Sequence, residues 1–268
     1  MNHLFRELAP ITDAAWSEID SEATRSLTHY LAARKLVDFT GPLGWDAVGV
    51  ANGRAHGVDG SNLDGVEVCR REAITLLELR TPFALSRGEL NRIDRGATDV
   101  DLDPVVEAAR KAAAAEDTIV FHGSPDGAPG IAEATPHAPV PLTGDFKDYP
   151  KSVARAVALL KESGVAGPYA LALGPRCYKG VIETTEHGGY PLLEHLHLII
   201  GGPVVWAPAV DGAIIISQRG GDVELVVGQD LSIGYSHHDA DAVQLYFEES
   251  IALRIAGPEA AVHLAYPS

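Results

Sequence analysis

The stretch from Gly220 to Ile255 reads GGDVELVVGQDLSIGYSHHDADAVQLYFEESIALRI and decides how the chain folds. Apolar residues at 223, 225 and 227 alternate with Glu224 and Val226, the period of two that is typical of a strand. Gly228 and Gly234 flank the short piece QDLSI, which predicts sharp reversals at both glycines. A second extended run carries the apolar residues Val243, Leu245, Phe247, Ile251, Leu253 and Ile255. The stretch contains no nucleophile–base pair and no metal-ligand spacing, so we interpret it as scaffold.

The same stretch resembles the C-terminal part of the encapsulin shell proteins, a bacterial nanocompartment family first described as linocin-type bacteriocins. Two more segments resemble this family in the same order: FRELAP at 5–10, ahead of Trp16, and RKLVDFTGPLGW at 34–45. The resemblance runs from Leu4 to the C-terminus. It implies an α+β fold of the Hong Kong 97-type phage major capsid class, with an N-terminal helix, a peripheral domain, an extended loop and an axial domain.

The resemblance also implies a division of the chain. The N-terminal helix and the start of the peripheral domain occupy 1–47, the extended loop 48–68, the peripheral domain with its spine helix 69–130, the axial domain 131–220, and the C-terminal strands of the peripheral domain 221–268.

Composition narrows the class of protein. The chain has 268 residues, enough for one large domain or two small ones. It has no apolar run of membrane-spanning length and no signal-peptide pattern, because Arg6 and Glu7 interrupt its start. Cys69 and Cys177 are far apart, which fits two small buried thiols in a reducing compartment. We therefore expect a cytoplasmic protein that does not bind a membrane.

Charge argues against a nucleic-acid partner. Asp and Glu number 37 against 21 Lys and Arg, a net charge of −16. A protein that packages nucleic acid needs Lys and Arg to displace phosphate counterions. The net charge therefore disfavours a genome-packaging capsid, the nearest relative of the implied fold.

An amphipathic helix is predicted near the N-terminus. Thr12 is suited to cap it, and its apolar residues recur at spacings of three and four from Trp16 to Leu31. We expect it to end between Arg34 and Asp38, ahead of the helix-breaking pair Gly41-Pro42. This pattern fits a helix that lies on its own core, and also a helix that leaves part of its apolar stripe open for docking.

Residues 48–68 contain three dipeptides that favour tight reversals, Asn52-Gly53, Asp59-Gly60 and Asp64-Gly65. Few of the other residues are large and apolar, so composition alone also fits a surface insertion. The resemblance implies instead an extended loop that becomes ordered against a neighbouring subunit. No Lys occurs between 48 and 68, so we expect non-covalent contacts only.

Asp103-Pro104 predicts a helix start, with Asp103 as the cap, and small residues line one face of the helix as far as Asp117. We expect a strand at 118–121 and a crossover between lobes at 123–141. Further on, the pattern predicts helices at 152–162, 176–185 and 191–199 and strands at 169–173, 204–207 and 213–217. Gly164 is placed to end the first of these helices.

Catalytic and ligand motifs are weak. His195 and His197 point to different sides of a helix, and His237-His238 is expected in a surface turn, so no metal site is predicted. Cys177 near His187 is the one pair that leaves a cysteine hydrolase open, although no third orienting group follows the pattern. Some relatives are thought to bind flavin beside an aromatic residue, but the matching piece LSRGEL at 85–90 has Arg87-Gly88 there. We therefore predict no cofactor.

The resemblance places two further surfaces. The loop lining a fivefold pore corresponds to Glu186, His187, Gly188, Gly189 and Tyr190, although these residues also fit a plain turn. The inner groove for a cargo protein's C-terminal peptide corresponds to Leu27, Leu31, Arg34, Val37 and Asp38, with Phe247 and Ile251 opposite. An ordinary core contact with an internal Arg34–Asp38 pair fits that set equally well.

The resemblance implies a non-catalytic shell protein that assembles into a hollow icosahedral cage, and the chain length fits a small shell of about sixty copies. By family precedent, its partners are other copies of itself and a cargo enzyme, either a dye-decolourising peroxidase or a ferritin-like iron-storage protein. A phage-type major capsid protein and a cysteine hydrolase remain the alternatives.

Overall fold

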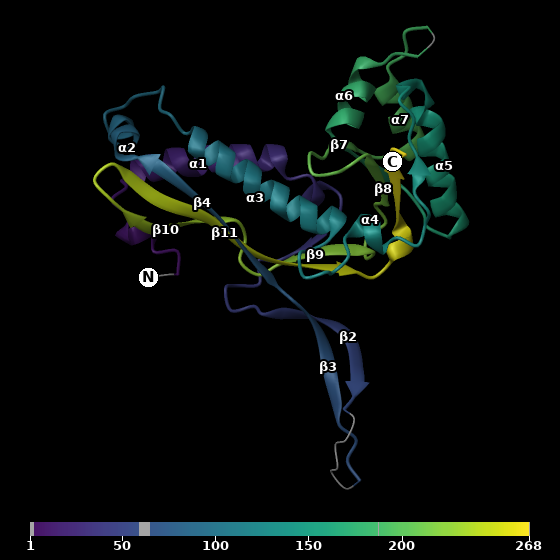
Figure 1. The fold of residues 1–268 in the computed structure, drawn as a ribbon, viewed down its shortest axis with the longest axis horizontal. Helices are drawn as coiled ribbons and strands as arrows, with labels where there is room; N and C mark the ends of the chain where they lie inside the picture. Colours follow the sequence, from purple (N-terminus) through teal and green to yellow (C-terminus); the bar gives the residue numbers. More distant parts are fainter. Residues whose placement is uncertain (1–2, 59–64, 187, 268) are drawn as a thin grey trace.

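The computed structural model describes residues 3–58, 65–186 and 188–267. Figure 1 shows a long lobe, a compact lobe at one end of it, and an arm that projects away from both. The helices are α1 (Asp13–Tyr30), α2 (Arg87–Asp94), α3 (Asp103–His122), α4 (Ile131–Ala134), α5 (Tyr149–Glu162), α6 (Pro175–Glu183) and α7 (Leu192–Ile200), with 3-10 turns η1 (Arg6–Leu8), η2 (Ala33–Lys35), η3 (Phe146–Asp148) and η4 (Pro258–Ala260).

The strands are β1 (Asp38–Thr40), β2 (Gly49–Gly57), β3 (Cys69–Thr75), β4 (Leu77–Ser86), β5 (Val140–Pro141), β6 (Tyr169–Leu173), β7 (Val204–Trp206), β8 (Ala213–Ser217), β9 (Val223–Val227), β10 (Ser232–His238), β11 (Ala242–Ile255) and β12 (Ala261–Ala265). The long lobe contains α1, α2 and α3 with β1, β4, β9, β10 and β11. The compact lobe contains α5 to α7 with β5 to β8 and β12. The arm is the β2–β3 hairpin.

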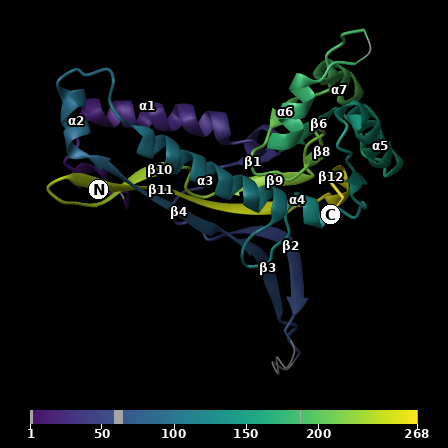
Figure 2. The ribbon, with the colours of Figure 1, turned by 45° about the horizontal axis from the view of Figure 1, so that its top comes forward.

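The long lobe is organised by β11, as the opening sequence stretch predicts. One edge of β11 pairs antiparallel with β4, from Ala242↔Ser86 to Ile251↔Leu77. The other edge pairs first with β10 and then with β9, and β1 completes the order β1-β9-β11-β10. Helix α3 lies across this sheet and α1 packs against α3, as Figure 2 shows. The apolar core of this lobe is therefore shared by one sheet and two long helices.

Two predicted reversals in β10 are wrong. Gly234 lies inside the strand, where a Cβ would come 2.2 Å from the Tyr246 ring, so the glycine makes room for that ring. His237 and His238 are the last residues of β10 and not part of a turn. The reversal comes afterwards, where the Asp239 carboxylate accepts hydrogen bonds from the N–H groups of Asp241 and Ala242, each at 2.8 Å.

The N-terminal helix begins as predicted and ends early. The Thr12 side chain accepts a hydrogen bond from the Ala15 N–H at 3.2 Å, which confirms the cap. The helix stops at Tyr30, short of the predicted end between Arg34 and Asp38, and a 3-10 turn follows. The Asp117 carboxylate accepts hydrogen bonds from the N–H groups of Ala32 and Ala33 there, so a long-range contact sets this end of the helix.

Helix α3 differs from its prediction at both ends. Leu102 is its N-cap and Asp103 is its first helical residue, so Asp103 does not cap it. The predicted strand at 118–121 is wrong, because the helix continues to His122. Ile119, Val120 and Phe121 are all buried in this last turn of the helix. A run of consecutive apolar residues is also typical of a buried strand, so the sequence pattern predicted the wrong element here.

The compact lobe confirms most of its predicted elements. Strands β6 and β8 have the predicted bounds, and their sheet has the order β5-β12-β8-β6-β7. Gly164 follows α5 with φ +76°, as expected of a residue that ends a helix. The last strand is the exception: β12 pairs with β8 and β5 in the compact lobe, although the division at residue 221 grouped it with the other domain.

The chain passes from β11 to β12 through a clamped connection. The Asp222 carbonyl accepts hydrogen bonds from the N–H groups of Ala256 and Gly257 at 2.7 and 3.0 Å. The Asp222 carboxylate in turn accepts two hydrogen bonds from the Arg219 guanidinium, at 2.8 and 2.7 Å. A short, doubly anchored segment therefore joins the two lobes.

Candidate functional site

The arm is a two-stranded hairpin with almost no burial. Its strands pair in register from Gly49↔Thr75 to Ala51↔Ala73, and again from Ala55↔Arg71 to Gly57↔Cys69. It therefore extends to Thr75, beyond the predicted limit of residue 68. Cys69 is exposed, so the expectation of a buried thiol is wrong there.

Asn52 and Gly53 form the irregularity in the arm. The register shifts between Ala51 and Ala55, and Gly53 has φ +80°, which confirms a reversal-type conformation at this dipeptide. The Asn52 amide donates to the Glu72 carboxylate at 2.5 Å, and His56 contacts the other Glu72 oxygen. Gly65 also has positive φ, +75°. Asp59, Gly60 and Asp64 lie outside the described residues.

The loop between α6 and α7 stands at the end of the compact lobe, at the top of Figure 1. The Glu186 N–H donates to the Tyr190 carbonyl at 2.8 Å, and Gly188 and Gly189 both have positive φ. The Glu186 carboxylate lies 2.9 Å from His195 Nδ1, which ties the loop to α7. Tyr190 is exposed, and His187 lies outside the described residues. The described part of this loop is thus a compact hairpin.

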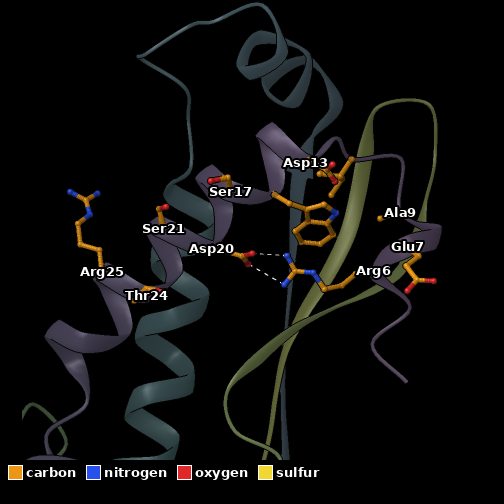
Figure 3. Close-up of a pocket in the computed structure, with 11 residues that line it drawn as sticks. Arg6, Glu7, Ala9, Asp13, Ser17, Asp20, Ser21, Thr24 and Arg25 are labelled. Atoms are coloured by element: carbon orange, nitrogen blue, oxygen red, sulfur yellow. Dashed lines mark hydrogen bonds and ion pairs between the residues drawn. The ribbon is translucent and has the colours of Figure 1, made fainter. Parts of the chain in front are cut away.

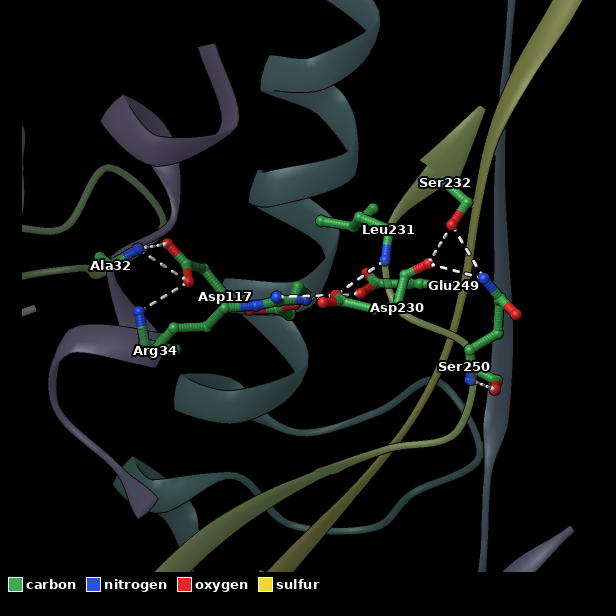
Figure 4. Close-up of polar contacts among 11 residues, drawn as sticks. Ala32, Arg34, Asp117, Asp230, Leu231, Ser232, Glu249 and Ser250 are labelled. Carbon is green, nitrogen blue, oxygen red and sulfur yellow. Dashed lines mark hydrogen bonds and ion pairs between the residues drawn. The ribbon is translucent and has the colours of Figure 1, made fainter. Parts of the chain in front are cut away.

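Arg34 is the centre of a buried charge cluster at the end of α1, drawn in Figure 4. Its guanidinium donates to Glu116 of α3 at 2.8 and 2.6 Å, to Asp230 at 2.8 Å and to Glu249 of β11 at 3.2 Å. Glu116 and Glu249 are almost fully buried. Burial opposes the charge, but the Glu116 and Asp230 carboxylates outweigh it and raise the pKa of Arg34 above its usual range. Arg34 therefore joins three elements of the long lobe.

The structure does not bring the predicted groove residues into one open surface. Phe247 and Ile251 are fully buried in different parts of the core, so neither side chain is open to a peptide. The ion pairs of Arg34 among the described residues are with Glu116, Asp230 and Glu249, so the alternative Arg34–Asp38 pair is wrong. Asp38 instead accepts a hydrogen bond from the Gly221 N–H at 2.5 Å.

The remaining predicted groove residues lie along the end of α1. Leu31 is buried, while Leu27 and Val37 are half-buried and pack against two different core clusters. Arg34, Val37 and Asp38 keep some exposed surface beside Phe39, whose ring lies 5.2 Å from the Arg34 guanidinium carbon. Only this edge of the predicted groove is accessible.

Sequence reasoning missed two hollows that touch α1. One, of about 1020 Å³, lies between η1 and α1, where Arg6 stacks on Trp16 at 3.9 Å and pairs with Asp20 (Figure 3). The other, of about 510 Å³, lies between His29 and Lys35 on one side and Trp206 of β7 on the other. The aromatic residues Trp16 and Trp206 were the available signal. The sequence spacing around each of them does not show which residues form the opposite wall of the hollow.

The candidate nucleophile Cys177 lies next to two tyrosine hydroxyls, and its predicted partner His187 is outside the described residues. Cys177 is buried, and its Sγ lies 3.1 Å from the Tyr149 hydroxyl and 3.4 Å from the Tyr266 hydroxyl. Among residues 3–58, 65–186 and 188–267, no three His, Cys, Asp or Glu side chains are grouped as metal ligands would be. Within the same residues, every helix is too short or too polar to cross a bilayer.

Comparison with known proteins gives the family. A family model described as "Encapsulating protein for peroxidase" matches residues 1–252. A type 1 encapsulin shell protein of Rhodospirillum rubrum is 52% identical over 98% of this chain and 96% of its own length. The chain belongs to the encapsulin shell proteins. The type 1 encapsulin shell protein of Mycobacterium tuberculosis is 40% identical over 99% of this chain and the whole of its own length.

Solved structures confirm the fold that the encapsulin resemblance implies. The virus-like particle from Pyrococcus furiosus matches with a TM-score of 0.63 over 92% of this chain and 98% of its own, at 21% identity. The capsid of an empty GTA particle matches with a TM-score of 0.53 over 89% of this chain and 90% of its own, at 15% identity. These identities establish the fold alone. The α+β, Hong Kong 97-type capsid fold is therefore confirmed, and the family model and the curated relatives confirm the shell-protein role.

Proposed function

We propose that this encapsulin chain closes with copies of itself into a hollow icosahedral particle of about sixty subunits that encloses a cargo enzyme. The observation that carries the proposal is the incomplete arm, an exposed hairpin on a chain that matches shell proteins over its whole length. A hairpin of two strands is marginal in water by itself. The arm reaches a stable state when a neighbouring subunit covers it.

The cargo is a peroxidase or a ferritin-like protein, held by its C-terminal peptide. The family model's description supports the first of these. We place the peptide along the accessible edge formed by Arg34, Val37 and Asp38, next to Leu27. The loop from Glu186 to Tyr190 lines the opening at the fivefold axis, and enclosure takes place in the cytoplasm. The shell itself is non-catalytic.

Imaging of the purified protein by negative stain, together with its mass by light scattering, tests assembly. We expect uniform hollow spheres of about sixty chains. A stable monomer at all concentrations would overturn the proposal. An absorbance ratio typical of nucleic acid in purified spheres would favour a phage-type capsid instead, against the net charge of −16.

Cargo binding has a separate test. Co-expression with a peroxidase that carries its C-terminal peptide should give spheres that contain peroxidase, and the variant Asp38→Lys should give spheres that are empty. The matched control is Asp99→Lys, an exposed residue outside the proposed edge. Equal loading of both variants would place the peptide elsewhere.

A further inference from the structure

The charge cluster around Arg34 holds more acid than base in a buried position. Glu116 and Asp117 reach it from α3, Asp230 from the β9–β10 connection, and Glu249 from β11. Arg34 and Lys35 of η2 are the cations on the opposite side. Lys35 is exposed and donates to the His29 carbonyl, so Arg34 is the cation inside the cluster. The neighbouring Glu248 belongs to a different cluster, with Arg80 and His3.

The hydrogen bonds that Arg34 donates are distributed unequally among these carboxylates. Glu116 receives the shortest and most numerous bonds and has no exposed side-chain surface. Glu249 receives one bond of 3.2 Å through Oε2, and its side chain is 1% exposed. Its Oε1 is buried and has no hydrogen-bond partner among the described residues. One guanidinium is therefore matched to Glu116, and Glu249 is left largely uncompensated.

A buried carboxylate without a full partner costs several kcal/mol, so such a group takes up a proton instead. Burial raises the pKa of Glu249 well above its usual range, and the neighbouring Glu116 carboxylate adds to the rise, while Arg34 opposes it. Both carboxylates accept from the same Arg34 Nη2, so they lie next to each other, and a proton on one can be donated to the other. A carboxyl–carboxylate pair that shares one proton satisfies this arrangement.

We propose that Glu116 and Glu249 share one proton, and that this proton latches the end of α1 to α3 and β11 and is released as the pH rises. Release leaves two adjacent buried carboxylates facing a single guanidinium. Their repulsion weakens the junction at which Arg34 joins η2, α3 and β11. The latch lies within one chain, so it does not require assembly.

The direction of the pH effect follows from the pKa. Glu249 has a higher pKa in the folded chain than in the unfolded chain, so folding takes up a proton. The stability that Glu249 provides is fully present below its unfolded pKa of about 4.3 and is lost as the pH rises through the folded pKa. The latch therefore makes the chain sensitive to alkali, and acid strengthens it.

The variant Glu249→Gln tests the latch, because its amide is neutral at every pH and keeps the shape of the protonated acid. We expect the thermal midpoint of the wild-type protein to fall between about pH 5 and about pH 9, and the variant to fall by about 3 °C less. Glu78→Gln, at an exposed position of β4, is the control and should follow the wild type. A fall as large in Glu249→Gln as in the wild type would overturn the latch.

Infrared difference spectra of the wild-type protein and of Glu249→Gln give a second measurement. The C=O stretch of a protonated carboxyl should be present in the wild type above the ordinary titration range of Glu and weaken as the pH rises. Glu249→Gln should lose part of this band, and the remainder comes from Asp117, because burial raises the pKa of Asp117 to about 7. Identical bands in the two proteins would overturn the shared proton. Both measurements apply to particles and to single chains, so failure to assemble does not affect them.

Discussion

The compact lobe and the arm use the same backbone pairing and differ completely in burial. Every residue of β6 and β8 is buried, whereas no residue of β2 or β3 is. Antiparallel hydrogen bonds are present in both, yet side-chain packing supplies most of the stability of a sheet. The compact lobe is therefore complete within one chain. The arm contributes to stability only after a second surface covers it.

The largest effect should come from opening a cavity in the compact lobe. Leu196 of α7 is fully buried, and Leu196→Ala should lower the free energy of unfolding by about 3 kcal/mol. Leu198 lies one half-turn away and is 75% exposed, so Leu198→Ala is the matched control and should change it by less than about 0.5 kcal/mol. Urea denaturation measures both. Equal losses would mean that α7 is not packed as described.

A smaller effect is expected where a buried carboxylate holds a helix end. In Asp117→Asn the amide oxygen still accepts from the N–H of Ala32 or Ala33, but the amide NH2 group faces the other N–H. The variant should therefore lower the free energy of unfolding by about 1.5 kcal/mol at about pH 5. Burial raises the pKa of Asp117 to about 7, so its contribution is lost as the pH rises from about 4 toward that value.

The Asn side chain does not titrate, so the variant should also lose this part of the pH dependence. Thermal unfolding at several pH values measures both effects, and Asp99→Asn on the surface is the control. An unchanged pH profile in Asp117→Asn would show that Asp117 is ionised throughout this range.

Shortening the arm should barely change the fold. Ala51 and Ala73 face each other in the hairpin, so an Asn-Gly turn can replace residues 52–72. We expect a change of less than about 0.5 kcal/mol in the unfolding of the unassembled chain, because the removed strands carry no buried side chains. Particles should no longer form in light scattering. Intact particles from this variant would contradict the role given to the arm.

The smallest effect should come from the polar contacts inside the arm. Glu72→Gln weakens the contacts of Glu72 with Asn52 and His56, and partly exposed ion pairs contribute about 0.5 kcal/mol or less. Amide hydrogen exchange should speed up in β2 and β3 and stay unchanged in β6 and β8. Faster exchange in the compact lobe would mean that the two regions are coupled.

Sequence patterns identified the elements that bury one regular face. The strands at 169–173, 213–217 and 223–227 have the predicted bounds, because each is a short apolar run between turn residues. The pattern failed where long-range contacts override it. Asp117, far along the chain, sets the end of α1, and burial on several sides made the last turn of α3 look like a strand.

The candidate site was less accessible to sequence reasoning. The resemblance assigned Arg34 to the peptide groove, but its observed partners Glu116 and Glu249 are 82 and 215 residues away. Nothing in local spacing links positions so far apart. Phe247 was assigned to a groove by the resemblance, whereas the structure packs it in a core cluster with residues of α1 and α3.

The clamp at Asp222 has a geometric consequence. Two backbone hydrogen bonds and an Arg219 pair hold the passage between β11 and β12, so these contacts restrain the bend between the two lobes. In any closed array of identical units, the bend of each unit dictates the curvature of the whole surface. The contacts around Asp222 therefore help to set the diameter of the assembled shell.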